Sequence, residues 1–138
     1  MALFFDHLEH PIEFVKRLTE KLNEYNEKQE SNLKLELRIG IHAGDSFYVE
    51  DLHHRPNRCS PAINKACRVM GFGENGHILC SYDYGKRLID MYGLEHYGSI
   101  LHNCGIREAK HDEEIGIYNI YNSSFGNPND PPKRCRAS

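Results

Sequence analysis

The sequence predicts one mixed domain, of the α+β or α/β class, in which helices cover a sheet. The clearest signal is the strict alternation of apolar and polar residues over positions 33–41, which is typical of a strand with one buried face. A second signal is the helical spacing of apolar residues over positions 12–25. Strand-like and helix-like segments then alternate along the chain, which is the order expected when helices pack on a sheet.

The N-terminal part of the chain is expected to place a helix between strands. Residues 1–5 form a short apolar run that predicts a buried strand, and Pro11 begins a helix that ends in the polar stretch 26–32. After the strand at 33–41, Gly44 and Asp45 favour a turn. Residues 46–50 are then expected to form the second arm of a hairpin, followed by a polar loop over 51–59.

The C-terminal part begins with a helix start signal, because Ser60 can cap a helix and Pro61 suits its first position. This helix carries an apolar stripe and is expected to end at Gly71 and Gly73, in left-handed conformation. A short buried strand is expected at 77–81, a helix at 83–93 and a last strand at 115–121. Residues 122–138 are rich in Gly, Pro, Asn and Ser, which predicts a tail without regular structure.

Size and charge narrow the classes of function. A chain of 138 residues suits a single domain. Its formal charge of -3 offers no positive field for a nucleic-acid backbone, so we expect no nucleic-acid partner. No segment approaches the roughly 20 apolar residues of a membrane-spanning helix. We therefore expect a cytoplasmic protein that does not bind membranes.

A Gly-x-Gly-x-x-Gly pattern occurs at residues 71–76, but its context argues against dinucleotide binding. That motif requires the glycines to follow a strand and to begin a helix, whose N-terminus holds the pyrophosphate. In this chain the glycines follow a predicted helix and precede a predicted strand. We therefore interpret them as the residues that end the helix and turn the chain.

Asn64 and Arg68 form a more informative pair on the same predicted helix. A spacing of four residues places the two side chains one above the other, where both can reach a common group. A guanidinium suits phosphate oxygens, and an amide can hold a ribose oxygen. The alternative interpretation is a solvated polar pair on the helix surface.

Four ordered motifs favour the first interpretation. They are LRIGIHAG at 37–44, SPAINKACRVM at 60–70, GHILCS at 76–81 and KHDEEIGIYNIY at 110–121. In order and spacing they resemble the second half of a class III adenylate/guanylate cyclase catalytic domain. The resemblance implies a ferredoxin-like nucleotide cyclase fold, of the α+β class and truncated at the N-terminus, with a mixed, mostly antiparallel sheet covered by helices. It makes residues 1–121 a partial cyclase domain and 122–138 a disordered or irregular tail.

The resemblance also implies roles for individual residues. Asn64 would orient the ribose, and Arg68 would stabilise the charge that develops on the α-phosphate. Lys110 matches the lysine that meets the terminal phosphates, although it could equally be a surface lysine at a strand edge. Asn57 occupies the position that helps to select the base in this family. Because it is not acidic, the base specificity stays open, pyrimidines included.

The implied activity is the synthesis of a cyclic nucleotide from a nucleoside triphosphate, with release of pyrophosphate, as part of intracellular signal transduction. In this family the active site forms between two protomers, so the expected partner is a cyclase protomer in a homo- or heterodimer.

Family catalysis uses Mg²⁺ or Mn²⁺ held by two aspartates, and both positions precede the part of the domain that this chain matches. We therefore assign no metal ligand in this chain and expect the chain alone to be inactive or nearly so. The alternative is a non-catalytic regulatory or nucleotide-binding module derived from a cyclase domain.

Overall fold

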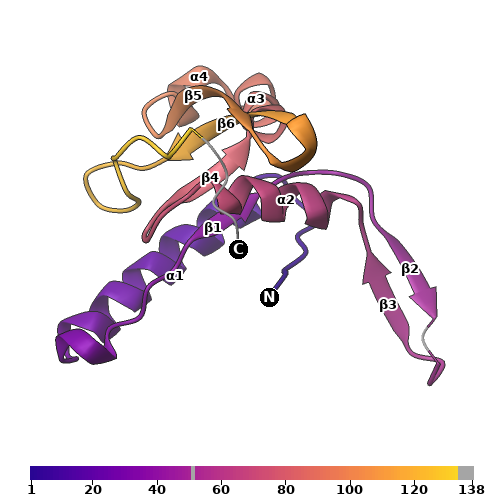
Figure 1. The fold of residues 1–138 in the computed structure, drawn as a ribbon, viewed down its shortest axis with the longest axis horizontal. Helices are drawn as coiled ribbons and strands as arrows, with labels where there is room; N and C mark the ends of the chain where they lie inside the picture. The colour runs from indigo at the N-terminus through magenta and orange to yellow at the C-terminus, as the bar shows by residue number, and fades with distance from the viewer. Residues whose placement is uncertain (51, 134–138) are drawn as a thin grey trace.

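The computed structural model describes residues 1–50 and 52–133. Within these residues the chain forms a four-stranded sheet in the order β1-β4-β6-β5 (Figure 1). The strands are β1 (Ile39–Ile41), β4 (Ile78–Ser81), β5 (Leu101–Glu108) and β6 (Glu114–Ile120). β1 pairs parallel with β4, whereas the β4–β6 and β5–β6 pairs are antiparallel. The predicted α+β class, with a mixed and mostly antiparallel sheet, is confirmed.

Helices pack on both faces of this sheet. The described helices are α1 (His10–Glu27), α2 (Ala62–Gly71), α3 (Tyr82–Tyr92) and α4 (Leu94–Tyr97), with short 3-10 turns η1 (Ser31–Leu33) and η2 (Lys110–Asp112). β6 contributes side chains to the cores on both faces of the sheet, because successive side chains of a strand point in opposite directions. Its Ile115 and Ile117 pack with α2, while Tyr118 and Ile120 pack with the helices α1, α3 and α4.

α2 lies directly against β1 because residue 40 has no side chain. A methyl group on Gly40 would overlap the carbonyl oxygen of Ala66 and lie 2.6 Å from the backbone nitrogen of Met70. A methyl group on Gly44 would lie 2.8 Å from Cβ of Ala62. The two glycines therefore set how closely α2 approaches the sheet along its length.

A separate two-stranded antiparallel hairpin projects from the body of the molecule (Figure 1). It consists of β2 (Phe47–Glu50) and β3 (Pro56–Cys59). The prediction that residues 46–50 pair with the strand at 33–41 is wrong, and so is the loop predicted over all of 51–59. β2 pairs instead with β3, from Phe47 opposite Cys59 to Glu50 opposite Pro56, so the hairpin closes between residues 50 and 56 and not at Gly44 and Asp45.

Two predicted strands are shorter or absent. Residues 1–5 are exposed and join neither sheet, and the strand predicted over 33–41 is reduced to Ile39–Ile41. Leu33, Leu35 and Leu37 are 53%, 56% and 38% exposed. An alternating pattern shows which face of a segment could be buried, but a segment becomes part of a sheet only where another strand pairs with it. β4 pairs only with Ile39–Ile41, the last three residues of the predicted strand.

The helix from Pro11 is confirmed as α1, and the segments predicted at 77–81, 83–93 and 115–121 are confirmed as β4, α3 and β6. Gly71 ends α2 and Gly93 closes α3, as predicted. The left-handed residue after α2 is Gly76, at φ 85°, and not Gly71 or Gly73.

The sequence analysis missed β5 and the short α4. β5 is an edge strand of the described sheet, and a bulge between Asn103 and Gly105 interrupts its alternation.

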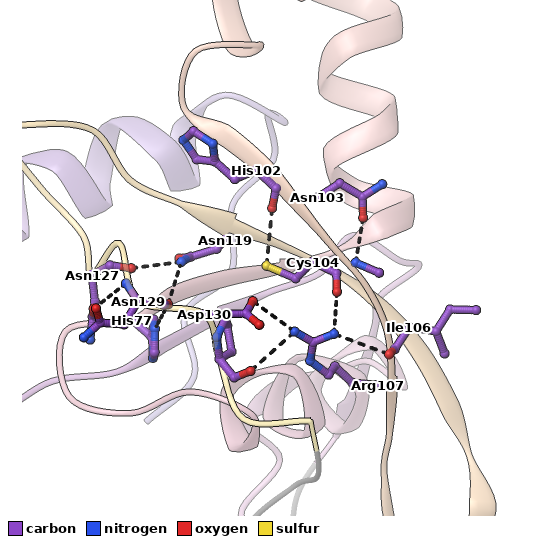
Figure 2. A network of polar contacts seen from close by, with 12 residues as sticks. His77, His102, Asn103, Cys104, Ile106, Arg107, Asn119, Asn127, Asn129 and Asp130 are labelled. Carbon is purple, nitrogen blue, oxygen red and sulfur yellow. Dashed lines mark hydrogen bonds and ion pairs between the residues drawn. The ribbon is translucent and has the colours of Figure 1, made fainter.

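The chain after β6 contains no helix or strand up to residue 133, the last described residue, yet buried side chains of the sheet hold it in place (Figure 2). His77 donates from Nε2 to the carbonyl oxygen of Asn129 at 2.8 Å, because its Nδ1 accepts the Glu74 amide. Asn119 donates to the carbonyl oxygen of Asn127 at 2.9 Å. We call residues 127–131 the strap. The assignment of 122–138 as a separate tail stays a prediction, and residues 134–138 lie outside the described part.

Arg107 is the charged anchor of the strap. It is 5% exposed, and its Nη2 donates to the Asp130 carboxylate at 3.2 Å and to the Pro131 carbonyl at 3.3 Å. Its Nη1 donates to the carbonyl oxygen of Cys104 (Figure 2). A buried guanidinium needs such partners to offset its loss of hydration.

No helix in the described ranges combines the length and the apolar character needed to cross a bilayer.

Gly40→Ala should destabilise the domain by at least about 2 kcal/mol, because the added methyl group meets helix backbone that cannot rotate away. Urea denaturation followed by circular dichroism measures the change. A loss below about 0.5 kcal/mol would show that α2 can shift without cost.

Arg107→Ala should release the strap and cost about 2–4 kcal/mol, since it removes several buried hydrogen bonds at once. Limited proteolysis should then cut within residues 122–133 much faster than in the parent chain. Arg87→Ala, which changes an exposed arginine on α3, is the matched control. Equal cleavage rates in all three proteins would contradict the anchoring role.

Candidate functional site

α2 presents both residues of the predicted pair on its exposed side. Asn64 and Arg68 are exposed and one helical turn apart, while Val69 of the same helix is fully buried. Ser60 fixes the start of the helix, since its hydroxyl donates to the Asp45 carbonyl at 2.5 Å and accepts the Ala62 amide at 3.1 Å. The helix begins at Ala62, with Pro61 at the N-cap position, one residue later than predicted, although the Ser60 hydroxyl still accepts the first helical amide.

Arg68 is joined by an ion pair to the connection between β5 and β6. Its Nη1 lies 3.0 Å from Oε1 and 2.8 Å from Oε2 of Glu113. The side chains are 46% and 38% exposed, so water screens the pair and its net contribution to stability is small. The contact brings α2 beside the short connection that also carries Lys110, three residues before Glu113.

That connection has an unusual backbone. His111 and Asp112 adopt left-handed conformations, at φ 62° and 59°, and the Ala109 amide closes the turn on the Glu113 carbonyl at 2.7 Å. Left-handed residues other than glycine are uncommon and often occur at functional sites. Lys110 is exposed at the start of this turn.

Asn57 lies apart from the other three predicted site residues. It is an exposed residue of β3, opposite Val49, on the projecting hairpin (Figure 1). In the structure, Arg68 therefore contacts the β5–β6 connection that includes Lys110, and Asn64 lies on the same helix as Arg68. Asn57 lies on β3, a different element.

A polar cluster that the sequence analysis did not assign lies where the parallel strands β1 and β4 end. His42 follows β1, and its Nδ1 is 2.6 Å from Oγ of Ser81, which also caps α3 by accepting the Tyr84 amide. Burial lowers the pKa of His42, and the positive charge of Lys65 acts in the same direction.

Lys65 connects this cluster to α2. Its Nζ lies 3.5 Å from a carboxylate oxygen of Asp83 in the first turn of α3. Both residues line a cavity of about 450 Å³ between α2, the start of α3 and the β5–β6 pair.

Glu113 and Ser81 are the residues of this region that the sequence did not predict. The only signal for Ser81 was its place at the end of a strand and the start of a helix, which is typical of a cap.

Divalent metal ions have no evident ligand set in the described part of the chain. Residues 1–50 and 52–133 contain no group of three or more His, Cys, Asp or Glu side chains that could hold a metal ion. Four cysteines, at 59, 67, 80 and 104, are free thiols. The site does offer guanidinium, ammonium and amide donors, of which Arg68 is paired with Glu113 and Lys65 with Asp83.

Comparison with solved structures identifies the architecture. The chain is similar to the guanylate cyclase domain of RhGC from Catenaria anguillulae, solved in complex with GTP, with a TM-score of 0.58 and 18% identity over 87% of this chain and 62% of that one. It is similar to the guanylyl cyclase Cya2, with a TM-score of 0.60 and 18% identity over 93% of this chain and 64% of that one.

The chain has a class III cyclase-like fold. The cyclase fold implied by the four motifs is thus confirmed. The chain spans less than two thirds of each of the two solved cyclases. No family model and no curated protein matches the sequence. The roles of Asn57, Asn64, Arg68 and Lys110 within this fold stay predictions.

Acid should destabilise this cyclase-like domain through His42. Because the folded state lowers the pKa of His42, the unfolded chain binds a proton more readily there. The stabilising contribution is therefore complete above about pH 6.5 and is lost as the pH falls below that value. Urea denaturation at pH 7.5, 6 and 5 measures this slope.

His42→Asn should flatten that slope, because asparagine can still bond to Ser81 but does not titrate. His96→Asn, at an exposed position of α4, is the control. If His42→Asn keeps the parent pH dependence, His42 is not the responsible group.

Proposed function

We propose that this chain is one half of a nucleotide cyclase, contributing the Asn/Arg side of an active site shared with a second cyclase protomer. The observation that carries the proposal is the joining of Arg68 to the connection that bears Lys110, on the exposed surface of a cyclase-like fold. In this proposal Arg68 exchanges its Glu113 partner for phosphate oxygens, and Lys110, three residues before Glu113, binds the same triphosphate.

Each residue has a role that its chemistry allows. The Arg68 guanidinium offers forked donors to the oxygens of the α-phosphate, where negative charge grows as the ribose 3′-oxygen attacks. Asn64, one turn earlier, holds the ribose so that this oxygen faces the phosphorus. Lys110 pairs with the terminal phosphates that leave as pyrophosphate. In this proposal the carboxylates that bind a divalent cation come from the other protomer.

The projecting hairpin supports contact with a second protomer. Phe47, Tyr48 and Val49 of β2 are 54%, 70% and 45% exposed, and Leu52 in the turn is 98% exposed. Apolar side chains gathered on an extended arm are typical of a surface that another chain covers. The second protomer could be a copy of this chain or a different cyclase protomer.

A guanine nucleotide is the first substrate to test, since the similar RhGC domain was solved in complex with GTP. Asn57 on the hairpin is the proposed base-contacting residue. Its amide both donates and accepts hydrogen bonds, so ATP and a pyrimidine triphosphate belong in the same assay.

The test is complementation of a disabled cyclase. The chain is mixed with a cyclase protomer that keeps its metal-binding aspartates but lacks its own Asn/Arg pair, and cyclic nucleotide is assayed with Mn²⁺ and GTP. We expect activity that falls about 100-fold or more with Arg68→Ala, because the lost donor acts on transition-state charge. Arg17→Ala on α1 is the matched control and should leave the activity unchanged.

A formed complex without any product, with all nucleotides and with Mg²⁺ or Mn²⁺, would contradict the catalytic proposal. The same result would favour the regulatory or nucleotide-binding module instead. Nucleotide binding by that complex, measured by calorimetry, would then separate these two non-catalytic roles.

A further inference from the structure

Arg68 already binds an anion that belongs to the chain itself. Its Nη1 lies 3.0 Å from Oε1 and 2.8 Å from Oε2 of Glu113, so both carboxylate oxygens share one guanidinium nitrogen. The stronger arrangement of such a pair places one oxygen on each of two nitrogens. Because the pair is also half-exposed, water and other anions can reach it, and its carboxylate can be exchanged.

The backbone of the β5–β6 connection brings Glu113 to this place. His111 and Asp112 adopt left-handed conformations, and the Ala109 amide donates to the Glu113 carbonyl at 2.7 Å. Glu113 then returns to extended backbone, at φ -72° and ψ 130°, immediately before β6. Left-handed residues other than glycine cost conformational energy and persist where the surrounding structure holds them. The carboxylate is therefore a fixed part of the turn.

The charge of this connection opposes a phosphate ligand. Residues 108–114 contain one lysine against four carboxylates, those of Glu108, Asp112, Glu113 and Glu114. A triphosphate that approaches Arg68 meets this negative charge. Glu113 opposes it most directly, because its carboxylate contacts the Arg68 guanidinium itself.

We propose that Glu113 is an internal competitor of the nucleotide. Its carboxylate occupies the Arg68 guanidinium until phosphate oxygens displace it, and in this way it sets the nucleotide concentration that the site requires. The inference rests on the proposed function for the identity of the anion, a nucleoside triphosphate, and adds the residue that limits its binding. When only a fraction of the binding sites is competent, the apparent affinity falls by that fraction. Removing the carboxylate should therefore strengthen binding.

Glu113→Gln tests the competition with an anion alone. The full chain is titrated with inorganic triphosphate at low ionic strength, and the backbone amide signals of residues 64–68 and 109–113 are followed by NMR. The apparent Kd should fall about three- to fivefold, because the substitution removes the competing charge and keeps the size of the side chain. Added salt should reduce this difference, since it screens exposed charges.

Glu114→Gln is the matched control. It removes the same charge one residue later, at an exposed position. Because Ile115 packs with α2, the preceding side chain of β6 points toward the opposite face of the sheet. Glu114→Gln should therefore change the apparent Kd less than about twofold.

An Arg68→Ala background supplies the second control. Without the guanidinium, the Glu113 carboxylate and the triphosphate no longer compete for one group. Glu113→Gln should then change the apparent Kd less than about twofold, and the difference between the two backgrounds measures the coupling of the two residues.

The complementation assay carries the comparison into catalysis. With Glu113→Gln in the chain, KM for GTP should fall about threefold, and kcat should stay within about twofold of the parent value. A residue that only held Arg68 in position would have the opposite signature, because its loss would raise KM or lower kcat.

The inference is overturned by any of three results with inorganic triphosphate. Glu113→Gln binds no more tightly than the parent chain, Glu114→Gln gives the same gain, or the gain persists in the Arg68→Ala background. Absence of binding by both the parent chain and Glu113→Gln counts as the first result. A raised KM in the complementation assay also overturns it. If the gain is found but complementation yields no product, the competition stands and the proposed function alone fails. Circular dichroism checks the fold of each variant.

Discussion

The close packing of α2 on β1 is the constraint on which the rest of the structure depends. Because Gly40 lacks a side chain, the helix backbone lies against the strand, and Val69 and Phe72 reach the core beneath it. That packing fixes the height at which Asn64 and Arg68 stand above the sheet. The ion pair of Arg68 with Glu113 then links the helix to the β5–β6 connection.

The sheet face under α2 is completed by an irregular segment and not by a second helix. His77, Arg107 and Asn119 are buried polar side chains, and each donates at least one hydrogen bond to a backbone carbonyl of the strap (Figure 2). Burying such polar groups without partners costs free energy, so the strap stabilises the buried polar side chains of the sheet, and these side chains hold the strap in place. The β5–β6 connection and its Lys110 are in this way held on a rigid support.

Two separate elements of the molecule carry the proposed contacts. α2 and the strained turn at His111 and Asp112 form the surface assigned to nucleotide, and the exposed apolar hairpin reaches outward from the body (Figure 1).

By itself, the sequence determined the elements whose signals are local. The helical period gave α1, the Ser-Pro start signal and the terminal glycine gave α2, and the apolar runs gave β4 and β6. The ordered motifs gave the cyclase-like fold. Only the tertiary structure decided how far β1 extends, because β4 pairs with Ile39–Ile41 and not with the leucines before them. It also decided that β2 pairs with β3. It also decided that Glu113 meets Arg68 and that an asparagine-rich tail covers a buried arginine, because these contacts join residues distant in sequence.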